Sequence, residues 1–514
     1  MNGAESLVRS LLASDVDVCF TNPGTSEMHF VAALDSVPGM RCVLGLFEGV
    51  ATGAADGFYR MAGRPASTLL HLGPGLANGI ANLHNAKKAG SGVVNVVGEH
   101  ATQHIALDAP LTSDIEGLSW PVSHWVRTSA TSADVGRDGA AAVAAAMAAP
   151  GQVATLILPG DTAWNPGGVV AEKVAVPGRP AVPDDAVEAA AGFLTGPDSL
   201  IILGGAALDA GPLELAGRIA AKTGCGLLTE WSNTRLERGA GRVAVNRIPY
   251  PVEQALEVLA PYKRIVLCGA RRPVAFFAYP DKPGVLTAPD VEFVEFCDWG
   301  ADIAGGLEAL ADRVGAAATS PAGVAEAGRP EVPDGPMDPK AIARVLGALI
   351  PENAIVVDES VTTGRDFFRH THGAPPHVWL NNRGGSIGYG MPVAIGAAIA
   401  CPDRKVLALE GDGSAMYTVQ SLWTMARENL DITGLIFANL SYRILHGELR
   451  NVGVQNPGPR AVDMLTLNRH DLGWVEMARG MGVEGTKVSE PGELARALTA
   501  GLASEGPYLI EVEV

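Results

Sequence analysis

Apolar and polar positions alternate along the chain in a pattern that predicts short buried strands joined by helices. The clearest unit lies near the C-terminal end. There the apolar run 406–409 leads into Gly411-Asp412-Gly413, helical periodicity follows over 417–427, and a second apolar run at 434–437 leads to Asn439. A strand, a tight turn, a helix and a second strand in this order form the building block of a parallel sheet.

The same alternation occurs in three parts of the chain. Two stretches rich in Pro, Gly and Ala, residues 159–185 and 315–339, interrupt the pattern as linkers would. A chain of 514 residues is also too long for a single core. We therefore predict an α/β fold with three parallel-sheet domains, at residues 1–165, 186–315 and 339–514.

Composition and charge narrow the classes of partner. The net charge is −18 and no basic stretch is present, so we expect neither nucleic acid nor an anionic membrane surface as a partner. No apolar run approaches the ~20 residues of a membrane span, and the first residues do not resemble a signal peptide. We expect a cytoplasmic protein. The six cysteines show no metal-binding or redox spacing and are predicted to be buried thiols.

The unit at 406–439 offers the chemistry of a phosphate and metal site. Glycines 411 and 413 allow a close approach of the backbone to a ligand. Asp412 and Asn439, 27 positions apart (412 to 439), would bring hard oxygen ligands to the ends of neighbouring strands, which suits Mg²⁺. A Gly-Asp-Gly sequence taken alone is more often a plain turn.

This spacing resembles the diphosphate and Mg²⁺ motif of thiamine-diphosphate (ThDP) enzymes. The resemblance implies that Asp412, Asn439 and the carbonyl of Ser441 bind Mg²⁺, and that the cofactor contacts Gly411, Gly413 and Ser414. Ala438 departs from the motif, because the family usually has a first Asn there.

Glu48 is predicted to stand between a strand and a helix. A carboxylate at a helix start is favoured by the helix dipole without any function. However, residues 47–65 resemble the family segment that carries the activating glutamate, and Gly73-Pro74-Gly75 with Asn78 resembles the loop that follows it. The resemblance, which covers essentially the whole chain, makes Glu48 catalytic and Gly73 and Asn78 cofactor-binding.

Two further segments of the third part match the family. In Asp358-Glu359-Ser360-Val361-Thr362, the resemblance places Ser360 near the thiazolium ring and Thr362 at the diphosphate. In residues 384–392, Ile387 matches the bulky side chain that bends the cofactor, and the Gly385 carbonyl matches the acceptor for its amino group. A lone Ile between glycines would otherwise be read as core packing.

The resemblance implies decarboxylation of a 2-oxo acid through a ThDP-enamine intermediate, with aldehyde release or carboligation. Thr25 and His71 resemble the substrate-handling residues of benzoylformate decarboxylase. A second family histidine is expected near 271–279, where the chain has Phe276 and Phe277 instead. These aromatics, with Ile444 and Leu445, would make an apolar substrate pocket. His100 and His446 are the alternative histidines, and either could equally be a surface residue.

Two alternative functions stay open at this stage. The overall layout also resembles the acetolactate synthase large subunit, a carboligase, although Glu99-His100 stands where that enzyme carries Gln. A catalytically silent partner subunit that binds ThDP is the second alternative. We expect no FAD, since Gly204-Gly205 has the pattern of a structural turn. In this family the site lies between two subunits, so a homodimer or homotetramer is implied.

Overall fold

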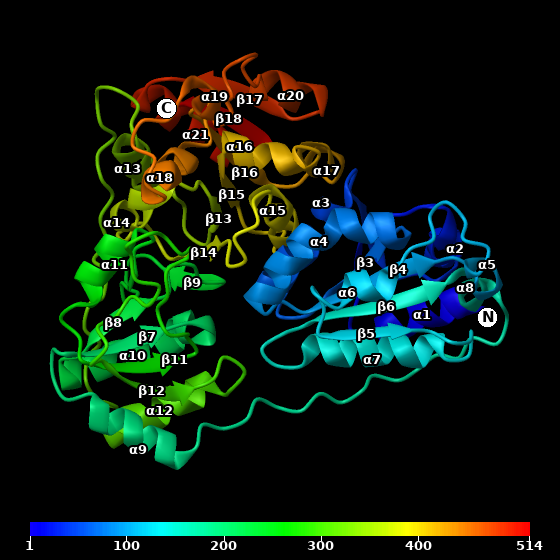
Figure 1. Ribbon diagram of the computed structural model, residues 1–514, viewed down its shortest axis with the longest axis horizontal. Coiled ribbons are helices and arrows are strands. Elements are labelled where there is room, and N and C mark those ends of the chain that lie inside the picture. Colours follow the sequence, from blue (N-terminus) through cyan, green and yellow to red (C-terminus); the bar gives the residue numbers. More distant parts are fainter.

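The computed structural model describes residues 1–514 and contains three β-sheets with helices on their faces (Figure 1). The first sheet has six strands, all parallel, because each strand returns to the same edge through a helical crossover. In spatial order its strands are β2 (Arg41–Leu44), β1 (Val18–Asn22), β3 (Ala66–Leu70), β4 (Val93–Glu99), β6 (Val153–Pro159) and β5 (Trp125–Thr128). Its main helices are α1 (Gly3–Ala13), α2 (Met28–Ser36), α3 (Glu48–Ala62), α4 (Leu72–Ala89) and α7 (Val135–Met147).

The second sheet has five parallel strands and belongs to the central part of the chain. Its order is β10 (Asn246–Arg247), β8 (Gly226–Thr229), β7 (Ser199–Leu203), β11 (Arg264–Cys268) and β12 (Glu292–Cys297). Helices α9 (Asp184–Phe193), α10 (Ala210–Thr223), α11 (Val252–Leu259) and α12 (Ile303–Arg313) accompany it.

The third sheet has seven strands, six of them parallel. Its order is β17 (Glu484–Val488), β18 (Tyr508–Glu513), β16 (Ile432–Ala438), β15 (Val406–Gly411), β13 (Ile355–Glu359), β14 (His377–Asn381) and β9 (Arg235–Arg238). Helices α13 (Pro339–Leu349), α15 (Gly390–Ala400), α17 (Ser421–Arg427), α20 (Trp474–Gly480) and α21 (Pro491–Ala503) surround it. The predicted fold class, three α/β domains, is confirmed.

The strand β9 departs from the expected organisation. It comes from the central part of the chain, yet it pairs antiparallel with β14 at the edge of the third sheet. Its four residues alternate in burial, with Leu236 and Arg238 turned inward. Pairing of this kind depends on contacts between residues far apart in sequence, and therefore no local sequence pattern predicts the position of β9.

The long connection between the first two sheets is mostly irregular. Helix α8 (Gly160–Trp164) occupies its start, and the chain then runs without regular structure to α9 at Asp184. Figure 1 shows this segment crossing in extended form from the first sheet to the second. No helix of the chain has the length and apolarity that crossing a membrane requires.

Helices α3 and α15 form the main contact between the first and third sheets. Glycines make the close approach possible: a Cβ on Gly57 would lie 2.1 Å from the Val393 carbonyl oxygen, and a Cβ on Gly396 would lie 1.9 Å from that of Ala54. Both helices are almost completely buried. Glu48 is the first residue of α3, and the turn at Gly385 directly precedes α15, which begins at Gly390. The contact between the two helices therefore sets the relative positions of Glu48 and this turn.

A buried ion pair fixes the same contact. Arg60 on α3 donates two 2.7 Å hydrogen bonds to Asp56, one turn earlier on the same helix. Its Nη1 donates to the carbonyl oxygens of Asn381 and Thr234 and to the Tyr389 hydroxyl. A single guanidinium thus joins α3 to residues of the central part and of the third sheet.

Candidate active site

The predicted catalytic residues of the first domain lie at the carboxyl ends of neighbouring strands β1, β2 and β3, where ligands of open α/β sheets bind. Glu48 begins α3 as its first residue and is buried, with 8% of its surface exposed. Its Oε2 accepts a 3.0 Å hydrogen bond from the Asn78 side chain on α4. The structure therefore brings together Glu48 and Asn78, which were predicted from two successive segments that resemble the family.

His71 lies at the end of β3 and forms a pair that the sequence did not suggest. Its Nδ1 is 2.8 Å from Oε2 of Glu27, a carboxyl that is 2% exposed and also accepts from the backbone N–H of Gly24. Burial raises the pKa of Glu27, an effect that His71 opposes. Thr25 is exposed and begins the short 3₁₀ turn Thr25–Glu27, which also contains Glu27. Gly24 lies against the His71 imidazole, since a Cβ on Gly24 would be 2.2 Å from His71 Cγ.

The segment Gly73-Pro74-Gly75 was predicted as a loop, and this is wrong. Helix α4 begins at Leu72, so these residues form its first turn. A proline fits there because the first N–H groups of a helix have no partner within it. Gly75 faces Glu48: a Cβ at Gly75 would lie 3.2 Å from Glu48 Oε1, whereas a Cβ at Gly73 would strike Ser113.

The predicted metal ligands lie at the carboxyl ends of β15 and β16. Asp412 is 1% exposed, and its two oxygens accept hydrogen bonds of 2.8 and 2.7 Å from the N–H groups of Gly413 and Leu440. Burial raises the pKa of this carboxyl, and no Lys or Arg pairs with it. Asn439 follows β16 directly, and its Oδ1 accepts from the N–H of Ser441. Asp412, Asn439 and Ser441 are thus adjacent in space.

Three non-glycine residues beside the candidate site have left-handed backbones. They are Leu72 (φ 52°), Val361 (φ 50°) and Leu440 (φ 53°). Each lies between predicted site residues, and Val361 is β-branched, for which this conformation is a true outlier. Such strain costs of order 1–3 kcal/mol per residue and is concentrated at functional sites. It supports a site at these three positions, which are the start of α4 and the segments that follow β13 and β16.

The side chain of Glu359 accepts hydrogen bonds from the C-terminal end of the turn that carries Gly385 and Ile387. One oxygen of this buried carboxyl, Oε2, accepts the N–H groups of Gly388, Tyr389 and Gly390 at 2.9–3.2 Å. Burial raises the pKa of Glu359 to about 7. Sequence reasoning missed Glu359, although it stands next to Ser360 at the end of β13. Ser360 itself is buried and donates to Asp358, while Thr362 precedes a short 3₁₀ turn.

Aromatic side chains of the central part cover this turn. A Cβ on Gly385 would lie 2.7 Å from the ring of Phe276. Phe276 in turn packs with Phe277, Trp231 and Tyr250, at ring-centroid distances of 4.9–5.7 Å. Phe276 and Phe277 remain about half exposed. Ile444 and Leu445 lie on α18 (Arg443–Asn451), whose Glu448 accepts a hydrogen bond from Tyr250.

Neither alternative histidine forms a hydrogen bond with the turn. His100 follows β4, and its Nε2 is buried without a hydrogen-bond partner, while Nε2 of His446 is 3.1 Å from the Ser441 hydroxyl.

The turn predicted at Gly204-Gly205 lies at the carboxyl edge of the central sheet. Gly205 has a left-handed backbone (φ 52°), and a Cβ on it would lie 2.3 Å from the Trp299 indole.

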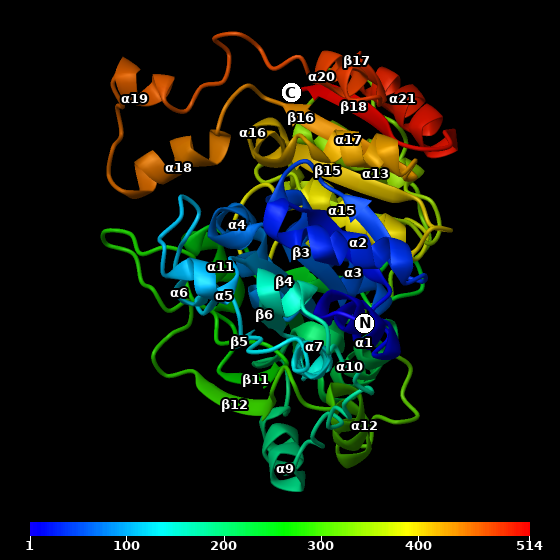
Figure 2. The ribbon, with the colours of Figure 1, turned by 90° about the vertical axis from the view of Figure 1, so that its right-hand side faces the viewer.

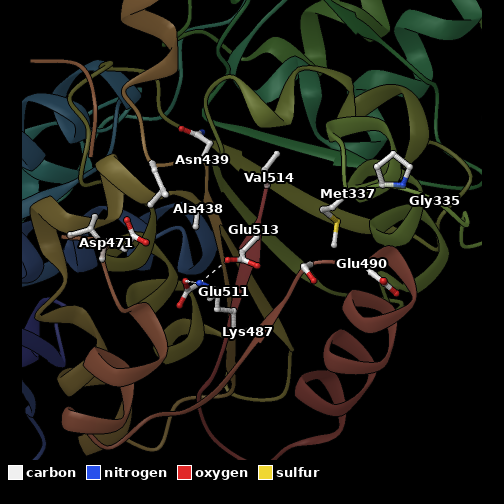
Figure 3. Close-up of a pocket in the computed structure, with 14 residues that line it drawn as sticks. Gly335, Met337, Ala438, Asn439, Asp471, Lys487, Glu490, Glu511, Glu513 and Val514 are labelled. Atoms are coloured by element: carbon white, nitrogen blue, oxygen red, sulfur yellow. Dashed lines mark ion pairs between the residues drawn. The ribbon is translucent and has the colours of Figure 1, made fainter. Parts of the chain in front are cut away.

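A cavity of about 760 Å³ opens beside the predicted metal ligands, at the carboxyl ends of β16, β17 and β18 (Figure 3). Asn439 lines it, and Lys487 projects into it between Glu511 and Glu513, with which it forms ion pairs of 3.0 and 2.8 Å. No other predicted site residue borders this cavity.

The candidate residues fall into two groups within one chain. Thr25, Glu48 and His71 form the first group, and Asp412, Asn439 and Ser441 form the second. No hydrogen bond or ion pair joins a member of one group to a member of the other. Figure 2 shows α18 and α19 (Pro459–Asp463), which follow the second group, projecting from the third domain.

Comparison with known proteins assigns the family. Residues 1–118 match the model of the thiamine pyrophosphate enzyme N-terminal TPP binding domain, and residues 361–512 match that of the C-terminal TPP binding domain. A Mycobacterium tuberculosis protein, IlvX, provisionally named an acetolactate synthase large subunit, is 51% identical over 100% of this chain and 99% of its own length. The chain belongs to the thiamine diphosphate-dependent enzyme family.

Other members extend the comparison. Benzoylformate decarboxylase of Pseudomonas aeruginosa is 30% identical, over 96% of this chain and 95% of its own length. The solved structure of a 4-hydroxybenzoylformate decarboxylase from Rhodococcus jostii superimposes with a TM-score of 0.85, covering 100% and 99% of the two chains at 24% identity. The structural match shows the shared three-domain fold of ThDP enzymes.

Proposed function

We propose that this ThDP enzyme uses Mg²⁺ and decarboxylates a 2-oxo acid that carries a bulky apolar side chain. The observation that carries the proposal is the presence, in one chain, of two separate polar groups at the ends of strands. One group contains the buried Glu48 with Asn78, and the other contains the buried, uncompensated carboxylate of Asp412.

The residues at Asp412 fit a divalent cation. A buried carboxylate with no Lys or Arg partner leaves negative charge unbalanced in a medium of low dielectric. Asn439 and the Ser441 carbonyl would add neutral oxygens, the ligands that Mg²⁺ takes alongside phosphate. The Gly411–Gly413 backbone and Ser414 would face the diphosphate, and Ser360 and Thr362 would approach it from β13.

ThDP supplies a carbon nucleophile that adds to a carbonyl group and then accepts the electron pair released with CO₂. The chain's own residues set proton positions around it. Glu48, fixed by Asn78, would hold a proton with the aminopyrimidine, and Ile387 and the Gly385 carbonyl would orient that ring. Glu27 fixes the imidazole of His71 at 2.8 Å, which leaves Nε2 to exchange a proton with substrate.

The aromatic cluster at Phe276 supports the choice of substrate. Its exposed rings stand directly over the turn that would hold the cofactor. An aromatic or branched side chain would bury apolar surface there, worth roughly 25 cal/mol per Å², whereas the methyl group of pyruvate would bury little. The relative named benzoylformate decarboxylase is consistent with an aromatic substrate.

The separation of the two groups within one chain supports an assembly of two copies. A complete site would combine the Glu48 group of one subunit with the Asp412 group of another, so we propose an obligate homodimer, or a homotetramer built from two such dimers. The projecting helix α18, which has no buried residue, would pack within that assembly.

CO₂ release by the purified protein, with ThDP and Mg²⁺, across 2-oxo acids from pyruvate to benzoylformate tests the proposal. We expect turnover and free aldehyde with bulky substrates. Glu48→Gln should abolish turnover while Mg²⁺ binding persists, and Glu116→Gln, which changes an exposed carboxyl on α6 (Ile115–Ser119), should leave turnover intact. Turnover of the Glu48→Gln variant at the native rate would refute the assigned role.

A carboligase of acetolactate synthase type is the second candidate, favoured by the name of the relative that is 51% identical. It predicts acetolactate from pyruvate instead of free aldehyde. A silent partner subunit predicts bound ThDP and no CO₂ from any 2-oxo acid. Product analysis in the same assay distinguishes all three functions.

A further inference from the structure

A helix of the first domain binds the middle of the turn that would hold the cofactor. Helix α4 carries Asn82 and Asn85, which are 3% and 0% exposed. Asn85 Nδ2 donates 2.8 Å to the carbonyl oxygen of Ser386, and Asn85 Oδ1 accepts 3.1 Å from the N–H of the same residue. One side-chain amide therefore binds both backbone polar groups of Ser386, the residue between Gly385 and Ile387.

Asn82 fixes the orientation of the Asn85 amide. Asn82 Oδ1 accepts 3.0 Å from Asn85 Nδ2, and Asn82 Nδ2 donates to the carbonyl oxygens of Gly49 and Gly388, at 2.8 and 3.1 Å. Each Nδ2 thus has two acceptors for its two hydrogens, and a buried amide satisfied in this way has a single orientation. Because Gly49 follows Glu48, the pair also fixes the turn relative to the start of α3.

Gly384 shows independently how closely the turn packs against α4. A Cβ on Gly384 would lie 2.3 Å from Asn85 Oδ1 and 2.7 Å from Asn85 Cα. Gly384 does not have a left-handed backbone, so it is the lack of space, and not the backbone conformation, that requires glycine here. Any side chain at position 384 would push the turn away from Asn85.

The two ends of the turn are bound from different domains. Residues 388–390 donate to Glu359 of the third domain, whereas Ser386 bonds to Asn85 of the first. Asn382, which begins the turn, also donates 2.7 Å to the Ser386 carbonyl oxygen, so Asn85 is the contact that ties Ser386 to another domain. Ile387 lies between the two points of attachment, and its position therefore depends on both.

We propose that Asn85, oriented by Asn82, is a positioning residue for the cofactor, because it sets where the Gly385 carbonyl and the Ile387 side chain lie. This inference rests on the proposed function, in which those two groups orient the aminopyrimidine ring. The role requires a donor and an acceptor in one side chain. Aspartate has the same shape but no amide donor, and it would place an oxygen against the Ser386 carbonyl oxygen.

Asn85→Asp tests the proposal through the bound cofactor as well as through turnover. ThDP has no chiral centre, so its near-ultraviolet absorption gives a circular-dichroism signal only when the site holds the ring in a fixed orientation. The variant should bind ThDP more weakly in calorimetry and lose most of this signal at saturating ThDP and Mg²⁺. Its kcat should fall by about 100-fold, since a misplacement of about 1 Å can have that effect. Retention of the native signal would overturn the proposal, whatever the turnover.

Asn95→Asp is the matched control. Asn95, on β4, is also a fully buried asparagine of the first domain, and its side chain bonds to Thr68 and Thr155 of the same domain. This variant should lower Tm, because a buried amide donor is lost, but keep the native circular-dichroism signal and kcat. An equal loss of signal in both variants would show that Asn85 acts only through stability, and would overturn the proposal.

Gly384→Ala changes the same contact from the side of the turn, at a half-buried position. It should reproduce the loss of signal, and it decides the question if Asn85→Asp does not fold. Native protein that shows the ThDP signal but releases no CO₂ from any 2-oxo acid refutes the proposed function alone, and the comparison of signals still tests Asn85. Native protein whose bound ThDP gives no signal overturns the positioning role, while the turnover assay still tests the proposed function.

Discussion

The Asp56–Arg60 pair should be among the most sensitive points of the fold. Its side chains are 1% and 0% exposed, and the guanidinium also bonds to Thr234, Asn381 and Tyr389. Replacing Asp56 with Asn leaves Arg60 as a buried charge without a counter-ion. Breaking a buried pair in this way costs about 3–5 kcal/mol.

The expected shift in Tm follows from the size of the unfolding unit. An unfolding entropy of about 2.1 cal/mol/K per residue gives about 1.1 kcal/mol/K for 514 residues. Asp56→Asn should therefore lower Tm by about 3–5 °C if the chain unfolds as one unit, and by more if the first domain unfolds separately. Differential scanning calorimetry of native and variant proteins measures both the shift and the number of transitions.

A second substitution separates charge burial from simple loss of packing. The double variant Asp56→Leu with Arg60→Met removes both charges and should be more stable than Asp56→Asn alone, because no buried charge is left unpaired. The coupling between the two side chains is measured by a double-mutant cycle that adds the single variants Asp56→Leu and Arg60→Met. If Asp56→Asn is as stable as the native protein, or if the double variant is less stable than Asp56→Asn, the conclusion that this buried ion pair stabilises the fold is wrong.

Three further predictions concern the site and the helix contact. Val361→Gly removes the strain of a left-handed backbone, roughly 1–2 kcal/mol, and the side chain that is lost is 40% exposed. After the entropy cost of the added glycine, the free energy of unfolding of the cofactor-free protein, measured by chemical denaturation, should rise by about 0.5–1 kcal/mol. The variant should also bind ThDP more weakly in calorimetry, and a loss of stability contradicts this prediction. Burial raises the pKa of Glu27 above its ordinary value of 4.5, so this carboxyl keeps its proton to a higher pH in the folded state than in the unfolded state. The stability that the protonated carboxyl contributes is fully present below about pH 4.5 and should be lost as the pH rises through the folded-state pKa. A plot of Tm against pH should therefore be flatter for Glu27→Gln than for the native protein, and parallel plots would show that Glu27 does not titrate as described. Gly57→Ala places a Cβ 2.1 Å from the Val393 carbonyl oxygen and should destabilise by about 1–3 kcal/mol, whereas Gly178→Ala, in open space, should not.

Much of the site could be predicted from local sequence. Glu48 at a helix start and Asp412 in a glycine turn lie at boundaries between a strand and a helix, and such boundaries are set by hydrophobic periodicity over a few residues. The structure places them at the carboxyl ends of parallel strands, as that pattern predicts. The roles proposed for them rest on the family resemblance, because a glycine turn with an acidic residue has the same local geometry in a structural turn and in a metal site.

The unpredicted features depend on contacts far apart in sequence. Glu27 lies 44 positions from His71, and its role becomes visible only when β1 and β3 pair side by side. The same holds for Glu359, which supports a turn about 30 residues away. The first turn of α4 was mistaken for a loop because Gly and Pro usually interrupt helices, and their tolerance in a first turn depends on where the helix begins.

The position of β9 has a practical consequence for recombining this protein with its relatives. A chimera that exchanges residues 186–315 as a block would replace β9, the edge strand of the third sheet, along with the central sheet. The recipient would then present β14 to a strand that had not evolved beside it, and an unpaired or poorly paired edge favours aggregation. Junctions that keep residues 235–238 with the third domain's own sequence should give soluble chimeras where block exchange does not.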